Sequence, residues 1–147
     1  RDGHADIRAT LRGHYGVPIP PDDEIAAMGP AEWRAALIGF LGFVKANLAG
    51  QTGLRQDALW GTQWSVLNGF AGFVPPDLLC REESLAADLA YLAKSARVKA
   101  PSIGGVPSGA TPVPVAEIHD RELEALVRDV YRRDYMSFGF GDWKAPK

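Results

Sequence analysis

Side chains that could perform chemistry are sparse and scattered in this sequence. The three histidines, His4, His14 and His119, show no metal-ligand spacing. No HExxH, CxxC, GxGxxG or GxxxxGK(S/T) motif occurs, and residue order alone defines no Ser-His-Asp or Cys-His arrangement. The one cysteine, Cys80, lies in an apolar run, which predicts a buried, inert thiol. The sequence therefore predicts no metal site, and these patterns leave the catalytic residues unknown.

Composition and charge narrow the class of protein. With 147 residues, 46% hydrophobic and 23% charged, the chain is expected to form one globular domain over residues 1–147. Sixteen basic and 18 acidic residues leave a formal charge of -2, which argues against a nucleic-acid-binding surface. A single cysteine cannot form an internal disulfide, so the composition favours a reducing, cytoplasmic setting. No apolar run reaches the roughly 20 residues that span a bilayer.

Hydrophobic periodicity predicts a mainly helical chain that carries one or two short strands at most. Pro30 suits the first position of a long helix and Gly50 its end. Asp120 is expected to cap the last helix, which carries arginines late in its length. The short apolar run at 78–80 predicts a buried strand. The remaining expected elements are helices at 5–15, 57–67 and 84–96, a brief turn capped by Asp22 and Asp23, and a loop at 97–115.

Three ordered segments between residues 57 and 140 carry a family resemblance. They are Asp57-Ala58-Leu59-Trp60-Gly61-Thr62-Gln63, then Arg81-Glu82-Glu83-Ser84-Leu85 followed by Asp88-Leu89, then Ile118 to Phe140 with Tyr131, Asp134-Tyr135 and Phe138-Gly139-Phe140. They resemble, in the same order and spacing, the D-x-H-W-x-x-Q, R-x-E-x-L-x-x-D-L and Y-x-x-D-(Y/F)-x-x-F-G-Y segments of bacterial and Golgi-type sulfotransferases. Those enzymes use 3′-phosphoadenosine 5′-phosphosulfate.

The resemblance implies that this chain is the C-terminal portion of an α/β sulfotransferase fold built like a P-loop protein. The expected reaction moves a sulfuryl group from 3′-phosphoadenosine 5′-phosphosulfate to a hydroxyl or amine of a small-molecule or glycan acceptor. Trp60, Gln63, Arg81 and Glu83 would then lie on the acceptor side or support it structurally. Because the sequence begins Arg1-Asp2-Gly3 without methionine, we expect its natural start to lie further upstream.

A weaker similarity at the start concerns the cofactor's 3′-phosphate. The family binds that group with an R-(D/N)-P strand end and a serine on the following helix. Arg1 and Thr10 are the corresponding candidates here, although Gly3 replaces the proline and Thr10 fits only with a slip of one residue. A guanidinium pairs well with phosphate oxygens, and a hydroxyl near a helix N-terminus adds a donor. A polar terminus without a binding role is the alternative.

Departures from the family pattern limit what the resemblance implies. The family's Gly-, Lys- and Ser/Thr-rich phosphosulfate loop has no counterpart here, and its histidine is replaced by Leu59. Because positioning and charge neutralisation dominate group transfer of this kind, these 147 residues alone are expected to be inactive. The enzyme assignment therefore stays uncertain at this level.

Structural roles compete with the functional ones at the matched residues. Trp60 and Gln63 suit packing and hydrogen bonding, and Arg81 and Glu83 could pair with one another for little net stability. A non-catalytic helical binding or interaction domain, whose aromatic surface serves a partner, is the second hypothesis. Formation of an oligomer is a further expectation that either hypothesis allows. The sequence leaves the acceptor, the catalytic base and the oligomeric state undetermined.

Overall fold

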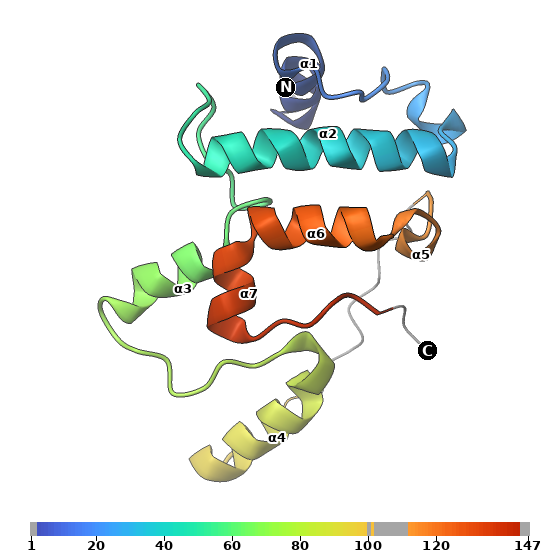
Figure 1. Cartoon of the computed structure of the whole chain (residues 1–147). Coiled ribbons are helices and arrows are strands. Elements are labelled where there is room, and N and C mark those ends of the chain that lie inside the picture. The colour runs from blue at the N-terminus through green and yellow to red at the C-terminus, as the bar shows by residue number, and fades with distance from the viewer. Residues whose placement is uncertain (1–2, 100, 102–111, 145–147) are drawn as a thin grey trace. The chain divides into compact units, whose positions relative to one another are not determined.

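The computed structural model describes residues 3–99, 101 and 112–144, with side chains from residue 7 onward. Helices dominate these ranges, and no strand occurs within them (Figure 1). The chain divides into two compact units, residues 1–68 with 111–147 and residues 69–110. Each unit is described by itself. The prediction of a mainly helical chain is thus confirmed for the described residues.

The first unit contains most of the helices. They are α1 (Gly3–Tyr15), a 3-10 turn at Ile25–Ala27, α2 (Pro30–Leu48), the start of α3 (Gln63–Ala71), α5 (Val115–Ile118), α6 (Arg121–Val130) and α7 (Arg132–Phe138). Helix α2 is the central element, since α1, α5 and α6 all pack on it. Figure 1 shows α1 on one side of α2 and α6 alongside its other side. Among the described residues, no helix combines the length and apolarity that crossing a membrane requires.

Local signals fix both ends of α2. Pro30 occupies the first helical position, and the Glu32 carboxylate accepts a 2.7 Å hydrogen bond from the Gly29 amide. Gly50 follows the helix with φ of +71°, a left-handed conformation that glycine adopts without strain. The sequence predictions for Pro30 and Gly50 are therefore confirmed.

The core of this unit lies between α1, α2 and the segment that precedes α3. Its buried residues are Leu11, Val17, Phe43, Val44 and Trp60. The Trp60 ring meets Phe40 and Phe43 edge-on, with centroids 6.0 and 5.9 Å away. Gly39 lets the segment after α1 lie close to α2, because a Cβ at that position would lie 2.6 Å from Cδ of Pro18.

Asn47 joins the end of α2 to the loop that follows it. Its side chain is 1% exposed. The amide nitrogen donates to Thr52 Oγ1 at 2.7 Å and to the Leu54 carbonyl at 2.8 Å, while its oxygen accepts from Trp60 Nε1 at 2.9 Å. Gln56 adds bonds from its side chain to the Asn47 and Leu48 carbonyls. These bonds satisfy buried polar groups and fix the loop against the helix.

The last helical segment is bent rather than continuous. Asp120 caps α6 as predicted, because its carboxylate accepts from the Leu123 amide at 2.8 Å. The helix then ends at Val130, Tyr131 takes φ -105° and ψ 29°, and α7 begins at Arg132. The single closing helix expected from the periodicity is thus divided in two. Bonds made by Tyr131 and Asp134 to the start of α3 hold the bend.

Two local predictions before and after α2 are wrong. Residues 57–61 form a turn rather than the first half of a helix, because Asp57 accepts hydrogen bonds from the Leu59 and Gly61 amides. Helix α3 begins only at Gln63. Upstream, the expected brief turn is present as the 3-10 turn at Ile25–Ala27, but no side chain caps it, and the Asp22 carboxylate pairs with Arg8 at 2.8 Å.

The second unit contains the end of α3, a 3-10 turn at Glu82–Ser84 and α4 (Leu85–Ala96). The predicted buried strand at 78–80 is wrong: these residues have no regular structure, and Leu79 is 47% exposed. Cys80 is also exposed, contrary to the expected buried thiol. Ser84 precedes α4 as expected, but its hydroxyl bonds Asp88 at 2.7 Å instead of capping the backbone.

Candidate functional site

Two of the sequence segments singled out above meet at the junction of α3 and α7. The Tyr131 hydroxyl donates to the Trp60 carbonyl at 3.2 Å. The Asp134 carboxylate accepts from the backbone amides of Gln63 and Trp64, each at 2.9 Å. Asp134 is buried, so a carboxylate far along the chain caps the N-terminus of α3. We call these five residues the α3–α7 junction.

Cation–π and ionic contacts surround this junction. The Arg133 guanidinium lies 3.6 Å from the centroid of the Trp64 ring. Arg132 pairs with Asp129 at 2.7 Å, and Arg128 with Asp142. The three late arginines of the last helical segment therefore act on neighbouring side chains of the protein.

The roles of Trp60 and Gln63 follow from this geometry. Trp60 is a core residue, 6% exposed, whose ring nitrogen is already bonded to Asn47. Gln63 contributes its backbone amide to the junction, while the residue is otherwise exposed. Burial raises the pKa of the Tyr131 hydroxyl, and the nearby Asp134 carboxylate raises it further. Tyr131 is therefore poorly suited to act as a base, and the junction as described is a structural support.

Arg81 and Glu83 belong to the second unit. Their charged groups lie 3.6 Å apart in an exposed pair, as the structural alternative anticipates. The Asp88 carboxylate accepts from the Ser84 hydroxyl and, at 3.4 Å, from the Arg81 amide. This local network orders the turn before α4.

The proposed 3′-phosphate residues receive little structural support. Arg1 lies outside the described residues. Thr10 lies well inside α1, which begins at Gly3, so its hydroxyl is not near a helix N-terminus as expected. The nearby Arg8 guanidinium is paired with Asp22. The Arg1 and Thr10 assignments therefore stay predictions.

A buried carboxylate cluster, which sequence reasoning missed, connects α6 to the C-terminal tail. Glu124 lies 3.0 Å from His119 Nε2, accepts from the Tyr135 hydroxyl at 3.0 Å and from the Trp143 amide at 3.3 Å. Arg128 is 3.9 Å away. Burial acts to raise the pKa of Glu124, but the hydrogen bonds from His119, the Trp143 amide and Tyr135 outweigh it and lower that pKa. Residue order offered no signal, because these groups lie on separate segments.

This Glu124 cluster resembles part of a general-base arrangement, since a carboxylate can orient a histidine. Burial raises the pKa of the Tyr135 hydroxyl, and its bond to Glu124 adds to that effect. The Trp143 ring packs on His119 with centroids 4.8 Å apart. The cluster thus holds the tail onto α6.

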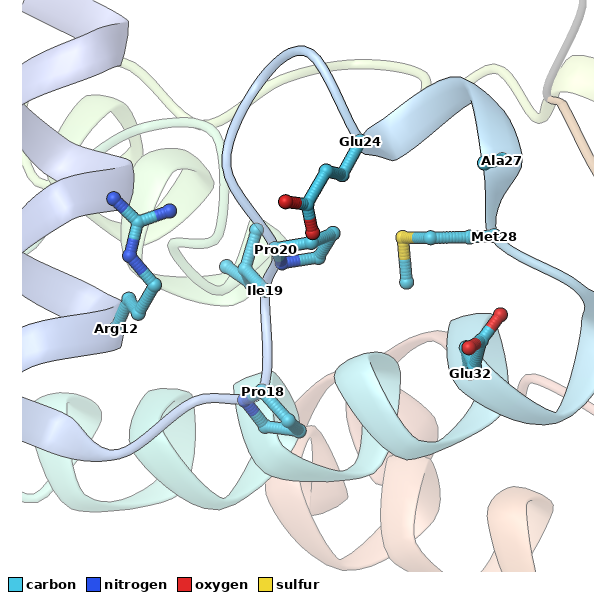
Figure 2. A pocket seen from close by; sticks show the side chains of 8 residues that line it. All are labelled: Arg12, Pro18, Ile19, Pro20, Glu24, Ala27, Met28 and Glu32. Carbon is cyan, nitrogen blue, oxygen red and sulfur yellow. The ribbon is translucent and has the colours of Figure 1, made fainter.

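An open hollow lies beside α1 and the start of α2. Its volume is about 550 Å³, and its lining includes Arg12, Glu24, Met28 and Glu32. Figure 2 shows Arg12 on one side and Met28 and Glu32 on the other, with Glu24 and Pro18-Ile19-Pro20 between them. One cation and two carboxylates do not favour a polyanionic cofactor at this hollow.

Within residues 3–99, 101 and 112–144, no group of three His, Cys, Asp or Glu side chains is arranged to hold a metal ion.

No protein-family model matches the chain, and neither a curated protein nor a solved structure was found to match it.

Proposed function

We propose that this chain is the acceptor-side helical portion of a sulfotransferase-like protein. In this proposal the whole protein would move a sulfuryl group from 3′-phosphoadenosine 5′-phosphosulfate to a hydroxyl or amine. The observation that supports it is the α3–α7 junction. Segments with the family-like patterns, separated by about 70 residues, are joined there by three hydrogen bonds through Trp60, Tyr131 and Asp134.

The residue types of the two joined segments are those that the α3–α7 junction requires. Asp134 and Tyr131 are three residues apart on the final segment, and both bond the turn that starts α3. A sequence that must preserve this junction needs Tyr and Asp at this spacing and a turn that exposes backbone groups to them. Two of the three family-like segments are therefore joined in one three-dimensional unit, which supports the proposal.

The proposal is tested by calorimetry with adenosine 3′,5′-bisphosphate on the longest natural form of the protein that contains this chain. Adenosine 5′-monophosphate is the matched ligand control, because it lacks the 3′-phosphate. We expect the bisphosphate to bind and the monophosphate to bind more weakly. Absence of heat with millimolar bisphosphate would contradict the proposal.

The Thr10 assignment has its own test in the same titration. Loss of a hydrogen bond to a charged phosphate is expected to weaken bisphosphate binding about tenfold in a Thr10→Val variant. Ser95→Ala is the control, since that hydroxyl bonds only the Tyr91 carbonyl in the structure and lies in the other unit. Equal affinity for Thr10→Val and the unmodified protein would remove Thr10 from the site while leaving the wider proposal standing.

A non-catalytic interaction domain is the second candidate, and exposed apolar side chains favour it. In the unit 69–110 the large exposed residues are Phe70, Phe73, Val74, Leu79, Tyr91 and Val98. Such exposure is typical of surfaces that meet a partner. Sedimentation across a concentration series should then reveal association that Phe73→Ser weakens and Asp77→Ser leaves unchanged. A monomer at every concentration would remove self-association as the role of this unit.

A further inference from the structure

The tail, residues 139–144, binds back onto the first unit as an irregular peptide. Residues 140–144 have no regular secondary structure, and Figure 1 shows the tail turning back from the end of α7. The Trp143 amide donates to the Glu124 carboxylate at 3.3 Å, and the Trp143 ring packs on His119. The Asp142 carboxylate pairs with Arg128. A backbone amide, an indole ring and a carboxylate of the tail thus each meet a matching group.

The groups that receive the tail are chemically selective. The lowered pKa of Glu124 keeps its carboxylate ionised at neutral pH, so it can only accept hydrogen bonds. The Arg128 guanidinium can only donate, and its position 4.5 Å from the centroid of the Tyr135 ring orients it. A buried charged group adds less stability than apolar packing can, but it discriminates strongly among the groups that face it. This surface is therefore suited to one kind of peptide rather than to any apolar segment.

The tail itself is held by contacts that can open at little cost. Trp143 is 38% exposed, and the exposed pair of Asp142 with Arg128 adds little net stability. Gly139 has a φ of +63°, a conformation in which glycine is unstrained, so the chain can turn there without resistance from a side chain. Segments with few buried contacts open locally while the rest of a protein stays folded. Opening of the tail would therefore leave the receiving groups on α6 in place.

We propose that the surface formed by His119, Glu124 and Arg128 binds an Asp-Trp segment of a partner protein, and that the tail is a tethered competitor for the same surface. The aspartate of the partner segment pairs with Arg128, the following amide donates to Glu124, and the indole lies against His119. The chemistry of this occupant is that of the segment already seated there. The inference is independent of the sulfotransferase proposal, since it uses neither the α3–α7 junction nor a nucleotide.

The experiment titrates the ¹⁵N-labelled full chain with an acetylated, amidated peptide that has the sequence of residues 140–144. The amide signals of residues 119–128 report binding at the surface. A full-chain Trp143→Ala variant weakens the tethered competitor, so the peptide should bind it about tenfold more tightly than it binds the unmodified protein. Equal peptide affinity for the two proteins would show that the tail does not compete for the surface and would overturn the proposal.

Matched substitutions separate recognition from nonspecific peptide binding. A peptide that carries Asp142→Asn keeps its shape but loses the charged pair, so its affinity for the Trp143→Ala protein should be about fivefold lower. Adding Arg128→Gln to that protein should abolish the preference between the two peptides, as expected for a direct pair. Arg132→Gln is the control, because Arg132 pairs with Asp129, and it should leave the preference unchanged.

Two further results would count against the proposal. The first is the absence of shifts in residues 119–128 of the Trp143→Ala protein at millimolar peptide, and the second is equal affinity for the two peptides. The circular dichroism spectrum of each variant checks that it is folded. Sedimentation identifies the other possible occupant, since a dimer of the unmodified protein that Trp143→Ala abolishes would assign the surface to the tail of a second copy and overturn the choice of a different partner.

Discussion

Buried side chains are distributed very differently in the two units of this chain. The first unit has a core around Trp60 in which apolar rings and a bonded asparagine pack together. In the described part of the unit 69–110, the one buried apolar residue is Ala93, and Phe73 is 90% exposed. Similar hydrophobic residue types thus stabilise one unit and remain on the surface of the other.

The difference arises from what each helix can pack against. Helix α2 is long, capped at its start, and has α1, α5 and α6 as partners. Helix α4 has an amphipathic sequence, but Leu85, Leu89 and Leu92 are only partly buried. An amphipathic pattern therefore predicts a helix, while the stability it provides depends on a second apolar surface.

The largest expected effect tests this contrast directly. Trp60→Ala should lower the free energy of unfolding by about 3–5 kcal/mol, because it leaves a cavity in a packed core. Phe73→Ala, which removes an aromatic ring from an exposed position, should change it by no more than about 0.5 kcal/mol. Urea unfolding followed by circular dichroism measures both. Equal losses of unfolding free energy in the two variants would contradict the contrast between a packed and an exposed aromatic residue.

The next effect concerns the polar centre of the first unit. Asn47→Leu should cost about 2–3 kcal/mol of unfolding free energy, because it leaves the Trp60 ring nitrogen without a partner in a buried place and removes the 2.8 Å bond to the Leu54 carbonyl. Asn47→Asp is the matched variant, since it keeps the acceptor for Trp60. Thermal or urea unfolding measures both variants. An unfolding free energy of Asn47→Leu equal to that of the unmodified protein would show that these hydrogen bonds do not stabilise the fold.

A smaller loss is expected at the α3–α7 junction. Asp134→Ala removes the group that caps α3, and losing such a cap costs about 1–2 kcal/mol. Asp134→Asn retains one acceptor oxygen and should lose less. Hydrogen exchange of the α3 amides, alongside urea unfolding, checks whether the loss is centred there. Unchanged protection of α3 would contradict the capping role.

The smallest expected effect is a dependence on pH through Glu124. The pKa of Glu124 is lower in the folded protein than its ordinary value of 4.5, although burial opposes that shift. Its contribution is therefore fully present above the unfolded pKa and is lost as pH falls through the folded pKa. Between pH 6 and pH 3, the unmodified protein should lose more stability than a Glu124→Gln variant in urea unfolding. Parallel losses would exclude a role for this carboxylate.

Much of the helical content could be predicted from local signals. Pro30, Gly50 and Asp120 mark helix ends through conformational and hydrogen-bonding preferences that act within a few residues. The wrong predictions of secondary structure also have local causes. Asp57 favours a turn by bonding nearby amides, and the short run at 78–80 could not distinguish a strand from an exposed segment.

The candidate sites were less predictable than the helices. The sequence indicated Trp60 and Gln63 as candidate residues. It did not indicate that the Asp134 carboxylate would cap the helix that begins at Gln63. The Glu124 cluster was not predicted, because its members, although all within residues 119–143, belong to different helices and to the tail. Such groupings carry no signature in the spacing of neighbouring residues.

By itself, the sequence determined where helices can begin and end, because capping and helix propensity depend on nearby residues. Only the tertiary structure decided which apolar faces are buried and where the last helical segment bends. Those outcomes depend on contacts between distant segments, such as Trp60 with Asn47 and Asp134 with the start of α3. The energy of each contact arises from burial, which exists only after those segments have packed together.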